Sequence, residues 1–192
     1  MKHIGIDYGS KFSGTTAICY VKNKALHFDQ SERQKDADEF VNNWITKNKP
    51  EAIYIDAPLS LPAAYQGKGT DFFFRKCDIE LDSKSPMSIG RMTATAMQLK
   101  ARFSSDSTTF YETYPAALAK LLAESADKTY SQKQENFEPF IALLEEHLPM
   151  PFAKAPEDWH QVEAALAWLA GHRHVNDKAE MAGEAKEGII LY

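Results

Sequence analysis

Near its start the chain reads HIGIDYGS, from His3 to Ser10, an apolar run that ends in an aspartate followed by a glycine turn. A second segment, Ala52–Pro58, repeats this pattern as AIYIDAP. Both segments predict short buried strands that deliver a carboxylate, Asp7 or Asp56, where a turn begins. A carboxylate at the end of an interior strand is costly to desolvate unless a cation or hydrogen-bond donors meet it. Two such strand ends lying side by side would form a metal site.

The elements between the two segments indicate how they pair. Strands are predicted over residues 4–7, 15–21 and 25–28. Asp36 then begins a predicted helix, with a glutamate three residues later as in a capping box, and this helix leads into the strand that ends at Asp56. Such a crossover favours parallel pairing with the first strand. Because open α/β sheets bind ligands at the C-terminal ends of parallel strands, Asp7 and Asp56 are expected at one edge.

Residues 57–107 form a long irregular excursion that starts at this expected edge. The segment is rich in proline and glycine, with short helices predicted at 71–81 and 92–103. Long excursions inside compact domains are more often functional than plain linkers. We therefore interpret 57–107 as a lid or insertion.

The rest of the chain completes one α/β domain. A fifth strand is predicted over 108–114 and carries Glu112. Helices are predicted to begin at Pro115, near Ser131–Gln134 and near Glu157–Asp158. The last of these helices is almost wholly apolar, as is typical of a buried helix, and His160 and Glu163 share one face near its start. The closing segment 188–192 is expected to pack across the core.

Composition narrows the class of protein. The 192 residues are 44% apolar and 26% charged, as in an ordinary soluble protein large enough for one domain. No apolar run approaches the roughly 20 residues that span a bilayer, and Asp7 interrupts any secretory pattern at the N-terminus. Cys19 and Cys77 lack metal-ligand spacing, which favours reduced thiols. We expect a cytoplasmic protein without a membrane partner, and the sequence does not indicate its oligomeric state.

The distribution of charge is uneven. The net charge of −5 argues against tight nonspecific binding of nucleic acid through total charge. Residues 83–105, however, contain no acidic residue and four basic ones, Lys84, Arg91, Lys100 and Arg102. This stretch would either face phosphates or form an ordinary solvated surface. Arg91 and Lys100 are therefore candidate substrate-binding residues.

Four acidic residues form the candidate catalytic set, namely Asp7, Asp56, Glu112 and Glu163. Ligands that are all oxygen select hard cations, so Mg²⁺ or Mn²⁺ is preferred over Zn²⁺. Two such ions about 3.5–4 Å apart can activate a water and stabilise the leaving oxygen of a phosphodiester. His160, with an unperturbed pKa of about 6.5, would orient Glu163 or move a proton.

Each of these residues also has a simpler structural explanation. Asp7 and Asp56 would serve as turn caps through their side chains. Glu112, on an alternating strand, would face solvent, and Glu163 would interact with the dipole at the helix N-terminus. His160 would be an ordinary structural histidine. No spacing in this set is a unique signature, so the four acids are informative only together.

The motifs of this chain occur in an order that resembles a known family. They are GIDYGSKFSG from Gly5, IDAPLSLP from Ile55, FRKCD from Phe74, ETYP from Glu112, HQVEAALAWLAG from His160 and the closing KEGIILY. Together they span nearly the whole chain and resemble domain-of-unknown-function family 429, described as predicted nucleases with an RNase-H-like fold. The resemblance implies a mixed sheet of about five strands with flanking helices and acids gathered at one edge.

The resemblance also implies roles for individual residues. Asp7 and Asp56 match the metal-binding strand acids of RNase-H-like enzymes, and Glu163 stands where the family more often has aspartate. These three are the expected metal ligands. Arg75 and Asp78 match a further family pair and are expected on the lid, facing substrate, unless they form only a surface ion pair.

These observations lead to one main functional prediction and two alternatives. The main prediction is a divalent-metal-dependent nuclease that hydrolyses phosphodiester bonds in DNA or RNA, with Mg²⁺ or Mn²⁺ as cofactor. The first alternative is a non-catalytic nucleic-acid or nucleotide binding module of the same fold. The second is an ATP-binding phosphotransferase, because GIDYGSKFSG also resembles the phosphate hairpin of sugar kinases and actin. Such proteins generally need two related domains, and this chain has no second copy of comparable length.

Overall fold

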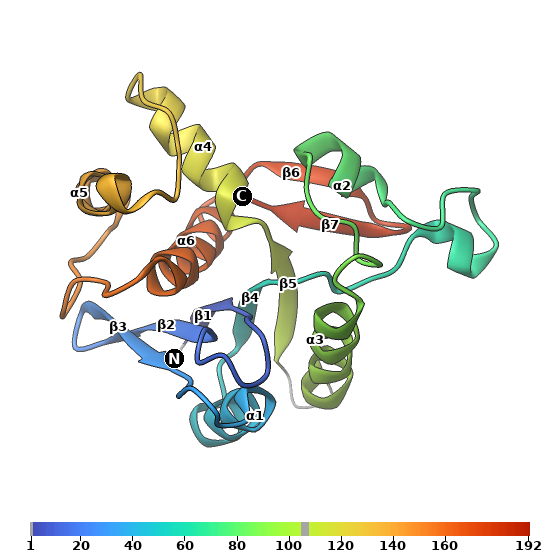
Figure 1. Cartoon of the computed structure of the whole chain (residues 1–192), viewed down its shortest axis with the longest axis horizontal. Helices are drawn as coiled ribbons and strands as arrows, with labels where there is room; N and C mark the ends of the chain where they lie inside the picture. Colours follow the sequence, from blue (N-terminus) through green and yellow to red (C-terminus); the bar gives the residue numbers. More distant parts are fainter. Residues whose placement is uncertain (1, 105–107) are drawn as a thin grey trace.

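One mixed β-sheet organises the molecule (Figure 1). This computed structural model describes residues 2–104 and 108–192, and within them seven strands lie in the order β3-β2-β1-β4-β5-β7-β6. The strands are β1 (His3–Asp7), β2 (Ala17–Lys22), β3 (Ala25–Gln30), β4 (Ala52–Asp56), β5 (Thr109–Thr113), β6 (Met181–Glu184) and β7 (Gly188–Leu191). The helices are α1 (Ala37–Asn48), α2 (Lys76–Leu81), α3 (Gly90–Phe103), α4 (Pro115–Ser125), α5 (Phe137–His147) and α6 (Trp159–His174), with short 3-10 helices η1 (Ala63–Gln66) and η3 (Gln134–Asn136).

The pairing of the strands confirms the predicted crossover. β1 and β4 are parallel, and their register sets Asp7 beside Asp56. β5 pairs with β4 and β7 pairs with β5 in the same parallel sense. β2 and β3 are joined to β1 by antiparallel pairing. The C-terminal ends of β1 and β4 therefore lie at one edge of the sheet, where α/β proteins commonly bind ligands.

The sheet has two more strands than the five predicted. The closing segment, expected to pack across the core, is instead strand β7, and β6 forms an antiparallel hairpin with it. β6 reads MAGE, which is too short and too polar for its alternation to predict a strand. The coarser prediction of a mixed α/β sheet with flanking helices is confirmed.

Helix α6 lies directly on the strands that carry the two aspartates. A Cβ atom added at Gly5 of β1 would lie 2.2 Å from the backbone nitrogen of Trp168 and 2.3 Å from the carbonyl oxygen of Ala164. A Cβ atom added at Gly171 would lie 2.4 Å from the ring of Tyr54 in β4. Glycine at both positions therefore lets α6 approach the sheet more closely than any side chain would allow.

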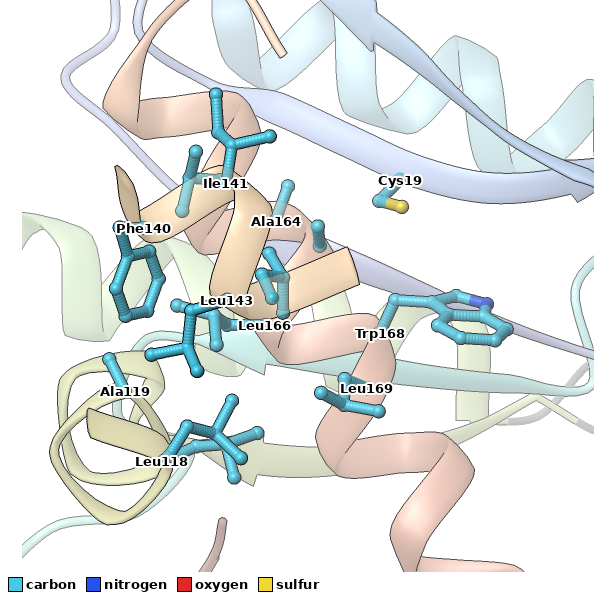
Figure 2. Close-up of a cluster of buried hydrophobic side chains, with 14 of the residues drawn as sticks. Cys19, Leu118, Ala119, Phe140, Ile141, Leu143, Ala164, Leu166, Trp168 and Leu169 are labelled. Carbon is cyan, nitrogen blue, oxygen red and sulfur yellow. The ribbon is translucent and has the colours of Figure 1, made fainter. Parts of the chain in front are cut away.

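Apolar layers cover both faces of the sheet, and the described residues form one compact domain. α6 packs with α4 and α5 on one face, where Figure 2 shows Leu118, Phe140, Leu143 and Leu169 among the clustered side chains. α1 and α3 cover the other face (Figure 1), over Ile4, Ile6, Ile53 and Ile55. None of the described helices is long and apolar enough to cross a membrane.

The predicted lid is tied to the far end of the sheet. It contains η1, α2 and α3, and its last residues, 105–107, lie outside the described part of the chain. Glu187, in the turn between β6 and β7, accepts hydrogen bonds from the N–H groups of Ala63 at 3.2 Å and Lys76 at 3.0 Å. α2 starts later than residue 71 because Asp71 accepts bonds from the next backbone N–H groups in a turn. The hairpin absent from the prediction thus anchors the lid.

Candidate functional site

The edge formed by the ends of β1 and β4 meets the first turn of α6. Side chains alternate along a strand, so Asp7 lies on the same face as Gly5, toward α6. There the Nδ1 atom of His160 lies 2.8 Å from Oδ2 of Asp7. Asp7, His160 and Glu163 each offer one ligand atom, and these atoms lie within 4.8 Å of one another. The structure thus brings together two of the predicted acids and the predicted histidine.

Asp56 is the neighbour of Asp7 across the β1–β4 ladder. Equal register on parallel strands sends both side chains to the same face, and Tyr54, two residues earlier, contacts α6 on that face. Asp56 is half-buried and lines a cavity together with Glu163. Burial, followed by the charges of Asp7 and Glu163, raises the pKa of Asp56 well above its usual range. Asp56 therefore belongs to the same electrostatic cluster.

The other members of the cluster also bind protons more tightly than in water. Burial raises the pKa of Asp7, and the hydrogen bond with His160 partly offsets this rise. Burial and then the charge of Asp7 raise the pKa of Glu163 to about 7. The hydrogen bond to Asp7 in turn raises the pKa of His160. Burial is the largest cause of the rise for each acid, and the neighbouring carboxylates add to it at Asp56 and Glu163.

The first turn of α6 is fixed by a polar network that links it to β3. Asp158 is the N-cap residue, and its Oδ1 accepts a hydrogen bond from the N–H of Gln161 at 2.9 Å. Gln30 of β3 donates to the other oxygen of Asp158 at 2.9 Å and accepts from the Gln161 side chain at 2.8 Å. This network sets the position of the helix start, and thereby that of His160 above Asp7.

Glu112 lies outside the group of converging ligand atoms, although it lines the same cavity as Asp56 and Glu163 and its charge contributes to the raised pKa of Asp56. The β4–β5 register pairs Glu112 with Ile55 rather than with Asp56. The two Glu112 oxygens accept hydrogen bonds from Arg75, at 2.7 Å from Nη1 and 2.6 Å from Nη2, and from the N–H of Leu59 at 2.8 Å. A catalytic role for Glu112 stays a prediction, since its carboxylate is committed to a cation of the protein itself.

Arg75 and Asp78 complete this second ion network, which borders the same cavity as Asp56 and Glu163. Both are buried, with side-chain exposures of 1% and 0%, so they do not form a surface ion pair. Arg75 donates from Nε and Nη2 to Asp78, from Nη1 and Nη2 to Glu112, and from Nη1 to Ser60. All five guanidinium N–H groups are therefore engaged within the protein. Their predicted contact with substrate is untested, and in this structure the pair joins the lid to β5.

The predicted basic residues do not gather at the acid cluster. Arg91 of α3 forms an exposed ion pair with Asp38, at 2.8 Å. Lys100 lines a different cavity, together with Tyr111 and His174. Of the basic stretch, Lys84 alone lines the cavity that contains Asp56 and Glu163 among the described residues. The prediction that Arg91 and Lys100 bind substrate remains untested.

Three residues at the site were absent from the sequence prediction. The Gln132 amide donates to Oε1 of Glu163 at 2.5 Å. Thr113 and Tyr114 line the same cavity as Asp56 and Glu163. Thr113 follows the Glu112–Ile55 pair, so it lies next to Asp56 on the α6 side of the sheet. The alternation of β5 was the available signal, because it assigns Thr113 rather than Glu112 to the face of Asp56.

The cluster suits a divalent cation. Asp7, Asp56 and Glu163 supply carboxylate oxygens, the donors that Mg²⁺ and Mn²⁺ prefer, and His160 supplies an imidazole nitrogen. Among the described residues no lysine or arginine forms an ion pair with any of the three acids. A bound cation would supply the missing positive charge.

Comparisons with known proteins add no relative. No protein-family model matches the chain, and no curated protein or solved structure matches it significantly. Any function is therefore inferred from the residues and their geometry.

Proposed function

We propose that this protein is a divalent-metal-dependent nuclease that hydrolyses phosphodiester bonds in nucleic acid. The observation that carries the proposal is the convergence of Asp7, His160 and Glu163 within 4.8 Å, with Asp56 beside Asp7 in register. Three neighbouring carboxylates that no lysine or arginine of the described residues pairs with favour metal binding over a purely structural role. A strand-end acid that served only as a turn cap would not need two further acids beside it.

In this proposal Asp7, Asp56 and Glu163 hold Mg²⁺ or Mn²⁺. A bound ion of this kind lowers the pKa of a coordinated water and stabilises developing charge on phosphate oxygens. Asp7 orients the imidazole of His160 through Nδ1, which leaves Nε2 without a hydrogen-bond partner among the described residues. Nε2 can therefore accept a proton from the attacking water or return one to the leaving oxygen. In the metal-free protein the hydrogen bond with Asp7 raises the pKa of His160.

The proposal includes the RNase-H-like assignment. The contiguous strands β3-β2-β1-β4-β5 match the number of strands that the family resemblance implies, and β7 and β6 extend them at one side. The closeness of Asp7, Asp56 and Glu163, which the resemblance implies as metal ligands, supports this part of the proposal. Nucleic acid is the substrate class that this resemblance implies.

The test measures metal binding and cleavage separately. Calorimetric titration with Mn²⁺ gives the affinity, and single-stranded and duplex oligonucleotides give the cleavage rate, for wild type, Asp7→Asn and Glu163→Gln. We expect at least tenfold weaker Mn²⁺ binding in both variants and loss of cleavage. Glu138→Gln is the matched control, because Glu138 is exposed on α5 and has no side-chain hydrogen bond among the described residues.

Two outcomes would count against the proposal. Unchanged Mn²⁺ affinity in Asp7→Asn would show that the cluster is not the metal site. Metal binding without cleavage of any DNA or RNA would favour the non-catalytic binding module instead.

A further inference from the structure

A cavity of about 530 Å³ opens beside the acid cluster. Asp56 and Glu163 line it on the side of the cluster, and the lid contributes Ile89 and Met92. Its volume lies within the roughly 300–1,000 Å³ that is usual for sites of small molecules. Its lining is mixed, because apolar side chains such as Ile89 and Met92 lie among polar residues and six charged ones, Asp56, Arg75, Asp78, Lys84, Glu112 and Glu163. The cavity therefore has the size of a ligand site.

Thr113 provides the first polar group that points to a ligand. The residue is 2% exposed, and its hydroxyl oxygen is buried without a hydrogen-bond partner among the described residues. It lines the cavity and follows the pair Glu112–Ile55, which places it next to Asp56. A buried hydroxyl without a partner is uncommon, because the loss of its hydrogen bonds to water is not compensated. A ligand in the cavity would supply that partner.

Two more groups in the cavity wall are uncommitted. The phenol of Tyr114 has no hydrogen-bond partner among the described residues, and burial followed by the charge of Asp56 raises its pKa, so it remains a neutral donor. Lys84 is exposed, and its positive charge lowers the pKa of both Asp56 and Glu163. An uncompensated hydroxyl, a phenol and an ammonium group thus lie in the wall of a cavity that also offers the apolar side chains of Ile89 and Met92.

We propose that this cavity receives one unstacked nucleotide of the substrate, next to the phosphodiester that is cleaved. This inference rests on the proposed function. A nucleoside has flat apolar faces for Ile89 and Met92, polar edges for Thr113 and Tyr114, and an adjoining phosphate for Lys84. A base that is paired and stacked in a duplex cannot enter such a pocket without being flipped out, which costs free energy. The substrate class is therefore single-stranded or locally unpaired nucleic acid.

The central test replaces the Thr113 hydroxyl by a methyl group in Thr113→Val. We expect the KM for a single-stranded oligonucleotide to rise about fivefold, with the Mn²⁺ affinity unchanged. The melting temperature should stay constant or rise, because the variant removes a buried hydroxyl that has no partner. A structural role for the hydroxyl would instead lower the melting temperature. Thr46→Val on the exposed side of α1, away from the cavity, is the matched control.

Substrate structure gives a second readout. Wild-type protein should cleave a single strand at least tenfold faster than the same strand in a perfect duplex, and an unpaired bulge should restore cleavage of the duplex near the bulge. Equal rates on paired and unpaired DNA and RNA would overturn the inference while leaving the proposed metal-dependent cleavage intact.

Binding of nucleoside monophosphates tests whether the cavity receives a nucleotide, even if no substrate is cleaved. Titration of wild-type protein with AMP, GMP, CMP and UMP in the presence of Mn²⁺ should show binding that is weakened about fivefold in Thr113→Val. Absence of binding by all four, or equal binding by wild type and Thr113→Val, would overturn the inference that the cavity receives a nucleotide at Thr113.

Discussion

Protonation of Glu163 should link the stability of the metal-free protein to pH. Burial and the charge of Asp7 raise the pKa of Glu163 from 4.5 to about 7 in the folded protein. Between these two values the unfolded chain has released this proton while the folded protein retains it. Stability falls with rising pH wherever the folded state binds more protons. The contribution of Glu163 to the free energy of unfolding should therefore decrease from pH 4.5 to pH 7 and then level off.

The size of this effect follows from the shift in pKa. Each tenfold change in proton affinity is worth about 1.4 kcal/mol, so the rise from 4.5 to about 7 corresponds to at most about 3 kcal/mol. For a chain of this length 1 kcal/mol changes the melting temperature by roughly 2–4 °C. Glu163→Gln removes the titrating group and should raise the melting temperature at pH 8 by roughly 6–12 °C relative to wild type, with little difference at pH 4.5.

The assay is thermal unfolding in EDTA from pH 4.5 to pH 8, for wild type, Glu163→Gln and the control Glu138→Gln. The informative quantity is the difference between variant and wild type at each pH, because Asp7 and Asp56 also titrate. If Glu163→Gln and wild type change in parallel across this range, then Glu163 does not hold a proton in the folded protein and the inferred rise of its pKa is wrong.

Three further predictions concern the residues that build the site. Arg75→Met leaves Glu112 and Asp78 buried without their cation, so the free energy of unfolding in urea should fall by about 3–5 kcal/mol. Arg91→Met removes the exposed pair with Asp38 and should lower it by less than about 1 kcal/mol. Equal losses in the two variants would refute the distinction between a buried and an exposed ion pair. Gly5→Ala places a methyl group against the backbone of α6, so we expect the free energy of unfolding to fall by about 1–3 kcal/mol. The affinity for Mn²⁺, measured on the same sample, should also be weaker. Asp7→Asn removes the charge that raises the pKa of His160, so NMR titration of the imidazole should show a lower pKa than in wild type, and an unchanged value would contradict the observed contact.

The central part of the fold could be predicted because its signals are local. An apolar run that ends in aspartate predicts both the strand and the position of the carboxylate at its end. The crossover helix between the two runs then predicts parallel pairing. Equal register of Asp7 and Asp56 follows from two strands of five residues that end at the same edge.

The parts that escaped prediction depend on tertiary contacts. β6 becomes a strand because β7 pairs with it, and its four residues carry too little periodicity to predict a strand on their own. The burial of Arg75 depends on Glu112, which lies 37 positions later in the sequence. No local pattern shows that a lid arginine and a strand glutamate neutralise each other.

Glu112 was assigned to the acid cluster from its residue type, because the sequence does not reveal the register of β5 against β4. The strand alternates, so one of its two faces carries Glu112 and the other carries Thr113. Selecting the acid was chemically reasonable, but the register pairs that acid with Ile55. A shift of one position reverses the face of every side chain on a strand, so the register alone decides which residue reaches Asp56.

The two groups of carboxylates in this protein therefore differ in how their charge is balanced. Glu112 and Asp78 share Arg75, whose five N–H groups are all engaged, so this network is complete within the protein and would be destabilised by losing any member. Among the described residues, Asp7 contacts His160 and Glu163 contacts Gln132, no lysine or arginine forms an ion pair with the three acids, and burial is the first cause that raises their pKa values. The two sets border one cavity, and the set around Asp7 is the one with which no lysine or arginine of the described residues forms an ion pair. A cation from solution would supply that charge, and for this reason we propose Asp7 rather than Arg75 as the centre of the function.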